Sequence, residues 1–189
     1  MFINLQPVFG TNYRSGQIYL TYDIGNAISI GISWFEYKSG GTPDIEKVSH
    51  CGVVISERFG VSAQPRGVDL ENLIDIFNDP HRRIVFIEPV LLDTLGALAL
   101  TQGMYSRIGT KYDWRLIAGF GIVNSWLGRK LPERVQKEIL RWFDCKGRVV
   151  CSEVICQELY KGGYCTDSNT RKTPEEMATC KCIKKWKRD

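Results

Sequence analysis

The sequence predicts an α+β fold, with strands mainly in the first half of the chain and helices mainly in the second. Strand-like segments rich in branched and aromatic residues end near residue 88, and segments of good helix formers follow. Apolar residues make up 43% of the chain, which is enough for a hydrophobic core and excludes global disorder. A length of 189 residues suits a single domain, here with a basic tail from about residue 181.

The expected strands combine branched and aromatic residues and end at turn-forming residues. Residues 67–77 are expected to begin as an edge strand and to continue as a short helix. Residues 28–35 fit two patterns: alternating isoleucines favour a strand, whereas the spacing of Ile28, Ile32 and Phe35 favours a helix. Both interpretations of this segment stay open. The clear strands are expected at residues 16–22, 49–56, 60–63 and 83–88.

The second half of the chain predicts a series of helices. Residues 93–108 contain few helix breakers, and a turn at residues 109–114 leads into a second helical region. Pro132 opens a third helix, because proline is favoured in the first turn. A last helix is expected from about residue 152 to residue 160, ended by the glycines that follow it.

Charge and hydropathy exclude several classes of partner. The net charge of +4 is mild and lies largely in the C-terminal tail, which we expect to be solvated, so no nucleic-acid partner is predicted. No run approaches the ~18 apolar residues of a membrane span, so no transmembrane segment is predicted. The first residues lack a basic start followed by an apolar stretch, which predicts no secretory signal and a cytoplasmic location.

The chain contains seven cysteines, an odd number that argues against a disulfide scaffold. Without an export signal, we expect free thiols in a reducing compartment. Cys180 and Cys182, with Cys165 upstream, raise the question of a zinc site. Their Cys-x-Cys spacing differs from the usual Cys-x₂₋₄-Cys pair, and no histidine lies nearby. We therefore predict no metal and no organic cofactor.

One cysteine, Cys151, stands where a thiol would be activated. It follows the short apolar segment Val149-Val150 and opens a helix on which Cys151, Ile155 and Leu159 share one face. A thiol at a helix N-terminus faces unpaired backbone N–H groups and the positive end of the helix dipole. Both favour the thiolate, which is the nucleophilic form. The position alone is also typical of a buried structural cysteine.

A cysteine nucleophile needs a base, and the chain has two histidines. His81 lies in a charged turn and is expected to be solvated. His50 opens a strand that is apolar on both faces, a pattern typical of a central strand. Alternation places His50 and Cys51 on opposite faces of this strand. His50 is then either a packed core residue or a group directed at a cleft.

Cys151 at a helix start and His50 at a strand edge resemble the active site of papain-like hydrolases, with the histidine before the cysteine. In this order the chain resembles the circularly permuted NlpC-type cysteine hydrolases, the YiiX- and YaeF-like group. Six short segments match the family's patterns in the same order, from residue 15 to about residue 178. They are SGQIYL (15–20), SHCGVVI (49–55), VSAQPRGV (61–68), GTKYDW (109–114), CSEVI (151–155) and TPEEM (173–177).

The resemblance implies that Cys151 is the nucleophile and His50 its base. Two positions depart from the family: Gln17 replaces its usual aspartate, and Ser62 replaces the glutamate that would orient the histidine. By alternation Ser62 and Gln64 lie on one face, and either could accept a hydrogen bond from the imidazole. We therefore expect Ser62 or Gln64 as the third catalytic residue.

The oxyanion of such a reaction needs hydrogen-bond donors, and the backbone N–H of Cys151 is the expected first donor. The hydroxyl of Tyr112 or Tyr19 could supply a second, although both tyrosines also fit a role in core packing. Asp113 is expected to cap the helix that follows it.

The resemblance implies a permuted papain-like fold, in which an antiparallel sheet of about five strands packs against helices. It implies cleavage of an amide or ester through a thioester, with cell-wall peptides and N-acyl or lipid amides as candidate substrates. A wall-directed enzyme would then need delivery by a phage particle or a secretion machine. Two alternatives stay open: a thiol acyltransferase of the same fold, and a binding module that has lost its chemistry, which Ser62 would favour.

Overall fold

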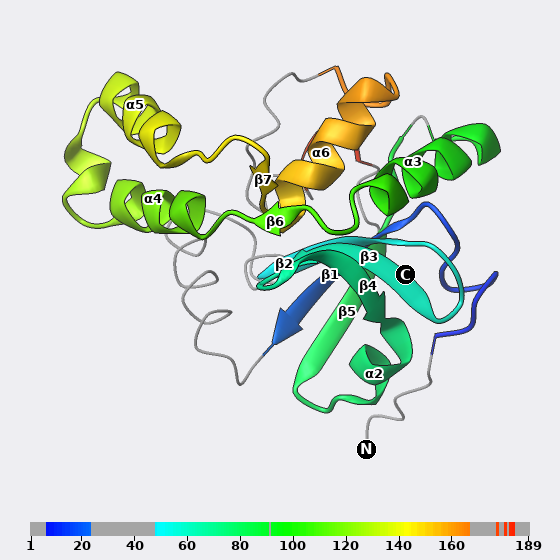
Figure 1. The fold of residues 1–189 in the computed structure, drawn as a ribbon. Coiled ribbons are helices and arrows are strands. Elements are labelled where there is room, and N and C mark those ends of the chain that lie inside the picture. Colours follow the sequence, from blue (N-terminus) through cyan, green and yellow to red (C-terminus); the bar gives the residue numbers. More distant parts are fainter. Residues whose placement is uncertain are drawn as a thin grey trace.

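The structure is a computed structural model that describes residues 7–23, 48–90, 92–166, 177, 180 and 182–183. Its centre is a five-stranded antiparallel sheet flanked by helices (Figure 1). The predicted α+β class and the antiparallel sheet packed against helices are therefore confirmed. Residues 28–35, for which strand and helix stayed open, lie outside the described residues, as do residues 173–176.

The sheet contains five strands, each within a few residues of its predicted position. They are β1 (Ile18–Asp23), β2 (His50–Val54), β3 (Phe59–Gln64), β4 (Gly67–Asn72) and β5 (Arg82–Ile87). Their order across the sheet is β4-β3-β2-β1-β5, with antiparallel pairing throughout. β2 is therefore the central strand and β4 an edge strand, as their sequences predict.

A tight hairpin joins β3 and β4 and fixes which side chains share a face. Gln64 pairs with Gly67, so the loop has two residues. Gly67 has a φ of +131°, a backbone conformation that favours glycine. In this register Glu71 pairs with Gly60. Glu71 therefore lies on the same face of the sheet as Ser62, which is two residues from Gly60.

The helices follow the predicted order, and a short parallel pair of strands leads into the last one. The expected cap is confirmed, because the Asp113 carboxylate accepts a hydrogen bond from the Leu116 N–H at 3.0 Å. Within the described residues, no helix is both long and apolar enough to cross a bilayer. The elements are α2 (Leu73–Asn78), α3 (Thr94–Ser106), β6 (Lys111–Tyr112), α4 (Trp114–Asn124), the 3₁₀ helix η1 (Gly128–Lys130), α5 (Glu133–Phe143), β7 (Arg148–Val149) and α6 (Cys151–Lys161).

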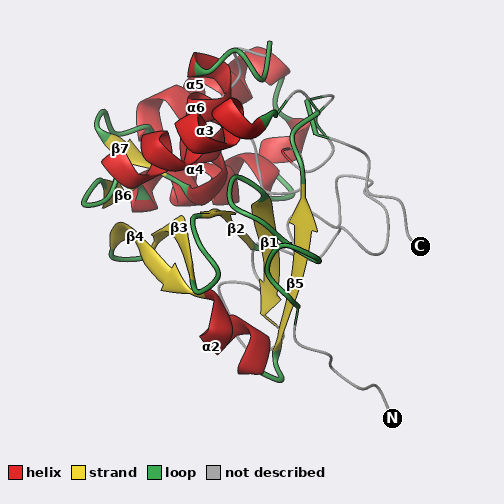
Figure 2. Ribbon diagram, turned by 90° about the vertical axis from the view of Figure 1, so that its right-hand side faces the viewer, coloured by secondary structure: helices red, strands yellow, loops and turns green. Residues whose placement is uncertain are grey.

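The two faces of the sheet bury different cores. Helices α3 and α6 lie on one side of the sheet and α2 on the other (Figure 2). The first core includes Val53, Val61, Met104, Ile155 and Leu159, and the second includes Tyr19, Val54, Leu73 and Ile76. Alternation along β2 produces this division, because Val53 and Val54 point to opposite faces.

Tyr19 lies flat across the centre of the sheet, over two glycines of neighbouring strands. It is fully buried, and a Cβ atom placed on Gly52 or Gly60 would overlap its ring. Glycine at both positions therefore makes room for the tyrosine. The phenol hydroxyl is held in this way near the middle of the sheet face that carries His50.

Replacing Gly52 with alanine should therefore destabilise the protein. We expect Gly52→Ala to lower the free energy of unfolding by about 1–3 kcal/mol, because the new methyl group forces the Tyr19 ring to move. Gly121→Ala in α4 is the matched control, since a Cβ there meets no atom within 4 Å and alanine favours the helix. Urea unfolding measures both. Equal stability of Gly52→Ala and the wild type would contradict this packing.

Candidate active site

Cys151 is the first residue of α6, as the sequence predicts. The preceding residue, Val150, is the N-cap and makes no side-chain hydrogen bond to the first turn. The thiol therefore lies at the positive end of the helix dipole without a competing cap. Cys151 exposes 5% of its surface and packs against the core between α6 and the sheet.

His50, the first residue of β2, is hydrogen-bonded to the Cys151 thiol. The adjacent Cys51 is hydrogen-bonded to the same thiol. Because the side chains of His50 and Cys51 leave opposite faces of β2, a sulfur reached by both lies beside the end of the strand. The structure thus brings together the two residues that the sequence singles out as nucleophile and base.

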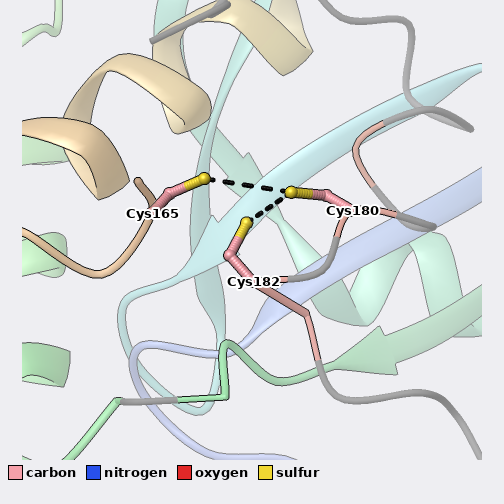
Figure 3. Close-up of side chains that lie close together, drawn as sticks. All are labelled: Cys165, Cys180 and Cys182. Atoms are coloured by element: carbon pink, nitrogen blue, oxygen red, sulfur yellow. Dashed lines mark hydrogen bonds between the residues drawn. The ribbon is translucent and has the colours of Figure 1, made fainter. Parts of the chain in front are cut away.

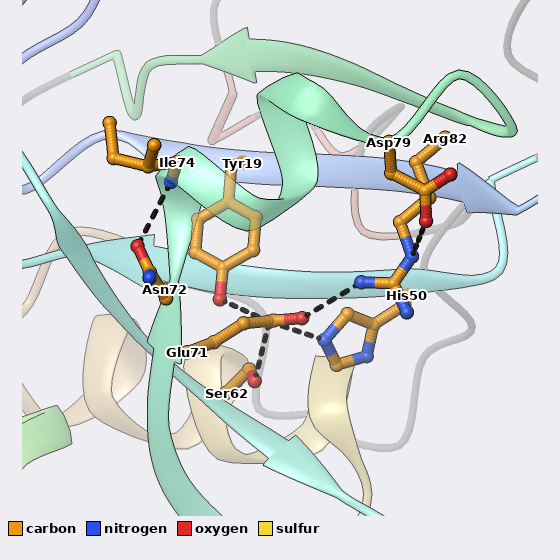
Figure 4. Close-up of polar contacts among 8 residues, drawn as sticks. All are labelled: Tyr19, His50, Ser62, Glu71, Asn72, Ile74, Asp79 and Arg82. Carbon is orange, nitrogen blue, oxygen red and sulfur yellow. Dashed lines mark hydrogen bonds and ion pairs between the residues drawn. The ribbon is translucent and has the colours of Figure 1, made fainter.

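Glu71 holds the other side of the His50 ring (Figure 4). Its Oε2 lies 3.0 Å from Nε2 of His50, which leaves Nδ1 as the ring nitrogen for the thiol. The same oxygen accepts hydrogen bonds from the hydroxyls of Tyr19 at 2.7 Å and Ser62 at 2.9 Å. The other oxygen, Oε1, lies 3.7 Å from Nη1 of Arg82. Side chains from four strands therefore converge on one carboxylate, carried by the fifth: three are within hydrogen-bond distance and one forms an ion pair.

The ion pair between His50 and Glu71 outweighs the effect of burial on both groups. Burial opposes the charged imidazole, but the Glu71 charge, together with the hydrogen bonds to Cys151 and Glu71, raises the pKa of His50 to about 10. Burial likewise opposes the carboxylate, yet the His50 charge and the hydrogen bonds it accepts lower the pKa of Glu71 to about 2. Both groups are therefore charged at neutral pH.

The surroundings of Cys151 favour the thiolate. The hydrogen bond from Cys51 is the largest influence and holds the pKa of the Cys151 thiol well below its usual value. Burial opposes this shift, while the hydrogen bond and the positive charge of His50 reinforce it. The resting site is therefore a thiolate–imidazolium pair, which is the reactive form of a cysteine nucleophile.

The group that orients the imidazole differs from the sequence prediction. We expected Ser62 or Gln64 to bond the His50 ring, and the structure has Glu71 there instead. The Ser62 hydroxyl donates a hydrogen bond to Glu71 and so supports the His50 ring indirectly, through the carboxylate. Gln64 ends β3 at the hairpin, and within the described residues its side chain makes no hydrogen bond to His50. The two-residue hairpin is the cause, because its register returns an acidic residue to this face.

Tyr19 and Tyr112, the two tyrosines considered as oxyanion donors, lie near different groups of the site. Tyr19 belongs to the site through its hydrogen bond to Glu71 rather than through the thiol. Tyr112 is half-buried in β6, and burial first and the negative charge of Cys151 second raise the pKa of its hydroxyl. Tyr112 therefore stays protonated close to Cys151, and its role as an oxyanion donor stays a prediction. His81 is exposed, as expected.

A separate group of three thiols lies beyond the end of α6 (Figure 3). The sulfur atoms of Cys165, Cys180 and Cys182 all lie within 4.8 Å of one another. Among the described residues they are the group of side chains that could hold a metal ion. All seven cysteines of the chain are free thiols in the structure.

The chemistry of this site rests on its geometry. A thiolate, an imidazolium and an ionised carboxylate lie in a row, which is the order of groups that activates a cysteine for attack on a carbonyl. Comparison of the chain with protein-family models and with curated proteins found no match.

Alkylation of Cys151 should depend only weakly on pH. A model thiol with a pKa of about 8.5 loses roughly two-hundredfold in alkylation rate between pH 9 and pH 6, as its thiolate disappears. We expect Cys151 to lose much less over this range, because its lowered pKa keeps the thiolate. Iodoacetamide labelling followed by peptide mass spectrometry gives the rate for Cys151. His50→Ala should move the profile toward that of the model thiol; a wild-type profile identical to it would refute the thiolate.

Glu71→Gln tests the carboxylate while keeping the size of the side chain. Burial then acts on His50 with only the Cys151 thiolate to oppose it, so we expect the pKa of His50 to fall from its value of about 10. Titration of the imidazole by NMR measures this shift. Asp69→Asn is the matched control: Asp69 lies on the same strand and face, is exposed, and accepts its hydrogen bond from the Leu70 N–H. An unchanged His50 titration in Glu71→Gln would contradict the pairing.

Proposed function

We propose that this chain is a cysteine hydrolase that cleaves an amide or ester bond through a thioester on Cys151. The row Cys151–His50–Glu71 is the observation that carries the proposal. A structural cysteine does not need a charged histidine at hydrogen-bond distance. A structural histidine likewise does not need a carboxylate that is itself held by two hydroxyls and an arginine. Strongly shifted pKa values in both directions within one group of contacts are typical of catalytic sites.

In the proposed reaction the Cys151 thiolate attacks the substrate carbonyl carbon, and the carbonyl oxygen becomes an oxyanion. The backbone N–H of Cys151, at the start of α6, is the expected donor to this oxyanion. His50 gives its proton to the leaving amine or alcohol as the scissile bond breaks, which leaves a thioester and neutral imidazole. His50 then takes a proton from water as the water oxygen attacks the thioester, and the acid and the thiolate are released.

Glu71 acts in this scheme by stabilising the positive charge of His50 and by fixing its ring. With Nε2 held by the carboxylate, Nδ1 is directed toward the sulfur. Tyr19 and Ser62 keep the carboxylate in position and are positioning residues in this proposal. Tyr112, protonated near Cys151, is the proposed second oxyanion donor.

The same observations support a circularly permuted papain-like fold of the NlpC type. The histidine strand precedes the cysteine helix in the chain, which reverses the order in papain. The central position of β2 and the start of α6 at Cys151 agree with that arrangement. In the family that the chain resembles, a glutamate stands at the position of Ser62. We propose that Glu71, on the neighbouring strand, takes the part of that glutamate.

Glu71 also bears on the alternatives. Loss of catalytic function was favoured by the serine at position 62, because a missing carboxylate would leave the imidazole unsupported. Glu71 supplies that carboxylate, so this reason for a binding module no longer holds. A thiol acyltransferase would use the same three groups and differ only in the acceptor of the acyl group.

The substrate class is open to a direct screen. We expect the wild-type protein to cleave either muropeptides or fatty-acyl amides, and Cys151→Ala to lose at least about 10³-fold in kcat/KM. Intact-protein mass spectrometry should detect an acyl adduct on Cys151 early in turnover. Cys145→Ala, which changes a half-buried thiol between α5 and β7, should keep full activity.

The pH profile adds a second criterion. Activity should fall above a pH of about 10, where His50 loses the proton that the leaving group needs. Undiminished turnover by Cys151→Ala would refute the proposed nucleophile. Acyl transfer to an added amine in preference to water would instead identify an acyltransferase.

A further inference from the structure

The three thiols of Cys165, Cys180 and Cys182 take no part in the proposed reaction. Cys165 lies four residues beyond the C-terminal end of α6, whereas Cys151 opens that helix. An 11-residue helix is about 16 Å long, so these three cysteines are separated from the candidate active site by the length of α6. A different explanation is needed for its assembly.

The segment that carries Cys180 and Cys182 is anchored in the main core. Met177 exposes 1% of its surface and Ile183 exposes 4%. The Ile183 N–H donates to the Cys180 carbonyl at 3.0 Å, and the Val90 N–H donates to the Cys182 carbonyl at 2.8 Å. A turn fastened to the chain just after β5 therefore presents two thiols toward Cys165 (Figure 3).

The spacing of the sulfur atoms suits a small, soft cation. Tetrahedral zinc with Zn–S bonds of about 2.3 Å sets its sulfur ligands about 3.8 Å apart. The sulfurs of Cys165 and Cys180 are 3.8 Å apart. Those of Cys180 and Cys182 are 2.6 Å apart and must separate by about 1.2 Å to ligate one ion, which rotation about their Cα–Cβ bonds allows.

We propose that Cys165, Cys180 and Cys182 bind a zinc ion that ties the C-terminal segment to the end of α6. Each thiol loses its proton on ligation, so three thiolates and Zn²⁺ form a centre of charge −1. Zinc in such sites takes four ligands. The described residues offer three thiolates, and in this proposal the fourth ligand is a water molecule.

A disulfide between Cys180 and Cys182 is the competing use of these thiols. It would leave Cys165 outside the bond, although the sulfur of Cys165 lies as close to that of Cys180 as two sulfur ligands of one zinc ion lie to one another. A disulfide also joins residues two apart in sequence and so closes only a very small loop, whereas zinc would close loops of 15 and 17 residues back to Cys165. The convergence of three thiols therefore favours a metal ion.

Metal content of the full chain tests the proposal. Wild-type protein dialysed against Zn²⁺ should retain one zinc ion per chain by plasma mass spectrometry, and each of Cys165→Ser, Cys180→Ser and Cys182→Ser should retain none. Replacing Zn²⁺ with Co²⁺ should give thiolate-to-cobalt charge-transfer bands and the strong visible bands of tetrahedral cobalt. Both should disappear in the three variants.

Two controls separate zinc binding from folding and from catalysis. Cys145→Ser and Cys151→Ala should both keep one zinc ion, since neither thiol belongs to the group. Far-ultraviolet circular dichroism of the three serine variants shows whether the fold persists without the metal. The proposal is overturned if wild-type protein binds neither Zn²⁺ nor Co²⁺, if a folded serine variant keeps its zinc, or if intact mass shows a Cys180–Cys182 disulfide that Zn²⁺ does not prevent.

Discussion

The partly buried carboxylate of Glu71 is the feature on which the candidate active site depends. A carboxylate removed from water is costly unless its charge is paired and its oxygens accept hydrogen bonds. Here one oxygen of Glu71 lies within hydrogen-bond distance of His50, Tyr19 and Ser62, and the other forms an ion pair with Arg82. With these partners the charge is retained, and it in turn keeps the imidazole protonated next to the Cys151 thiol.

The sequence predicts most of the fold because the local signals are strong and agree with one another. The strands carry branched and aromatic residues, and Asp113 caps the helix after it. Cys151 and His50 could be found for the same reason: each stands at the border of a clear element. Their contact could be inferred only from the resemblance, because the distance between a helix start and a strand end is set by tertiary packing.

Glu71 could not be found from spacing along the chain, because its carboxylate comes from β4, whereas the expected residues Ser62 and Gln64 lie on β3. The signal that could have found it is the Pro65-Arg66-Gly67 sequence between two strand-like segments. A two-residue loop there fixes the register, which sets Glu71 opposite Gly60. The three proposed zinc ligands are evident as cysteines in the sequence, but their Cys-x-Cys spacing differs from the usual zinc pattern, and only tertiary packing brings the sulfur of Cys165 to those of Cys180 and Cys182.

The convergence of four strands on the carboxylate of the fifth has a consequence for folding. All five strands precede Cys151 in the chain, and until they form the sheet its sulfur has no charged imidazole beside it and remains an ordinary, weakly nucleophilic thiol. Reactivity then arises together with the native sheet. A chain that has not yet folded is thereby spared premature oxidation of this sulfur and, under the proposed function, its premature acylation.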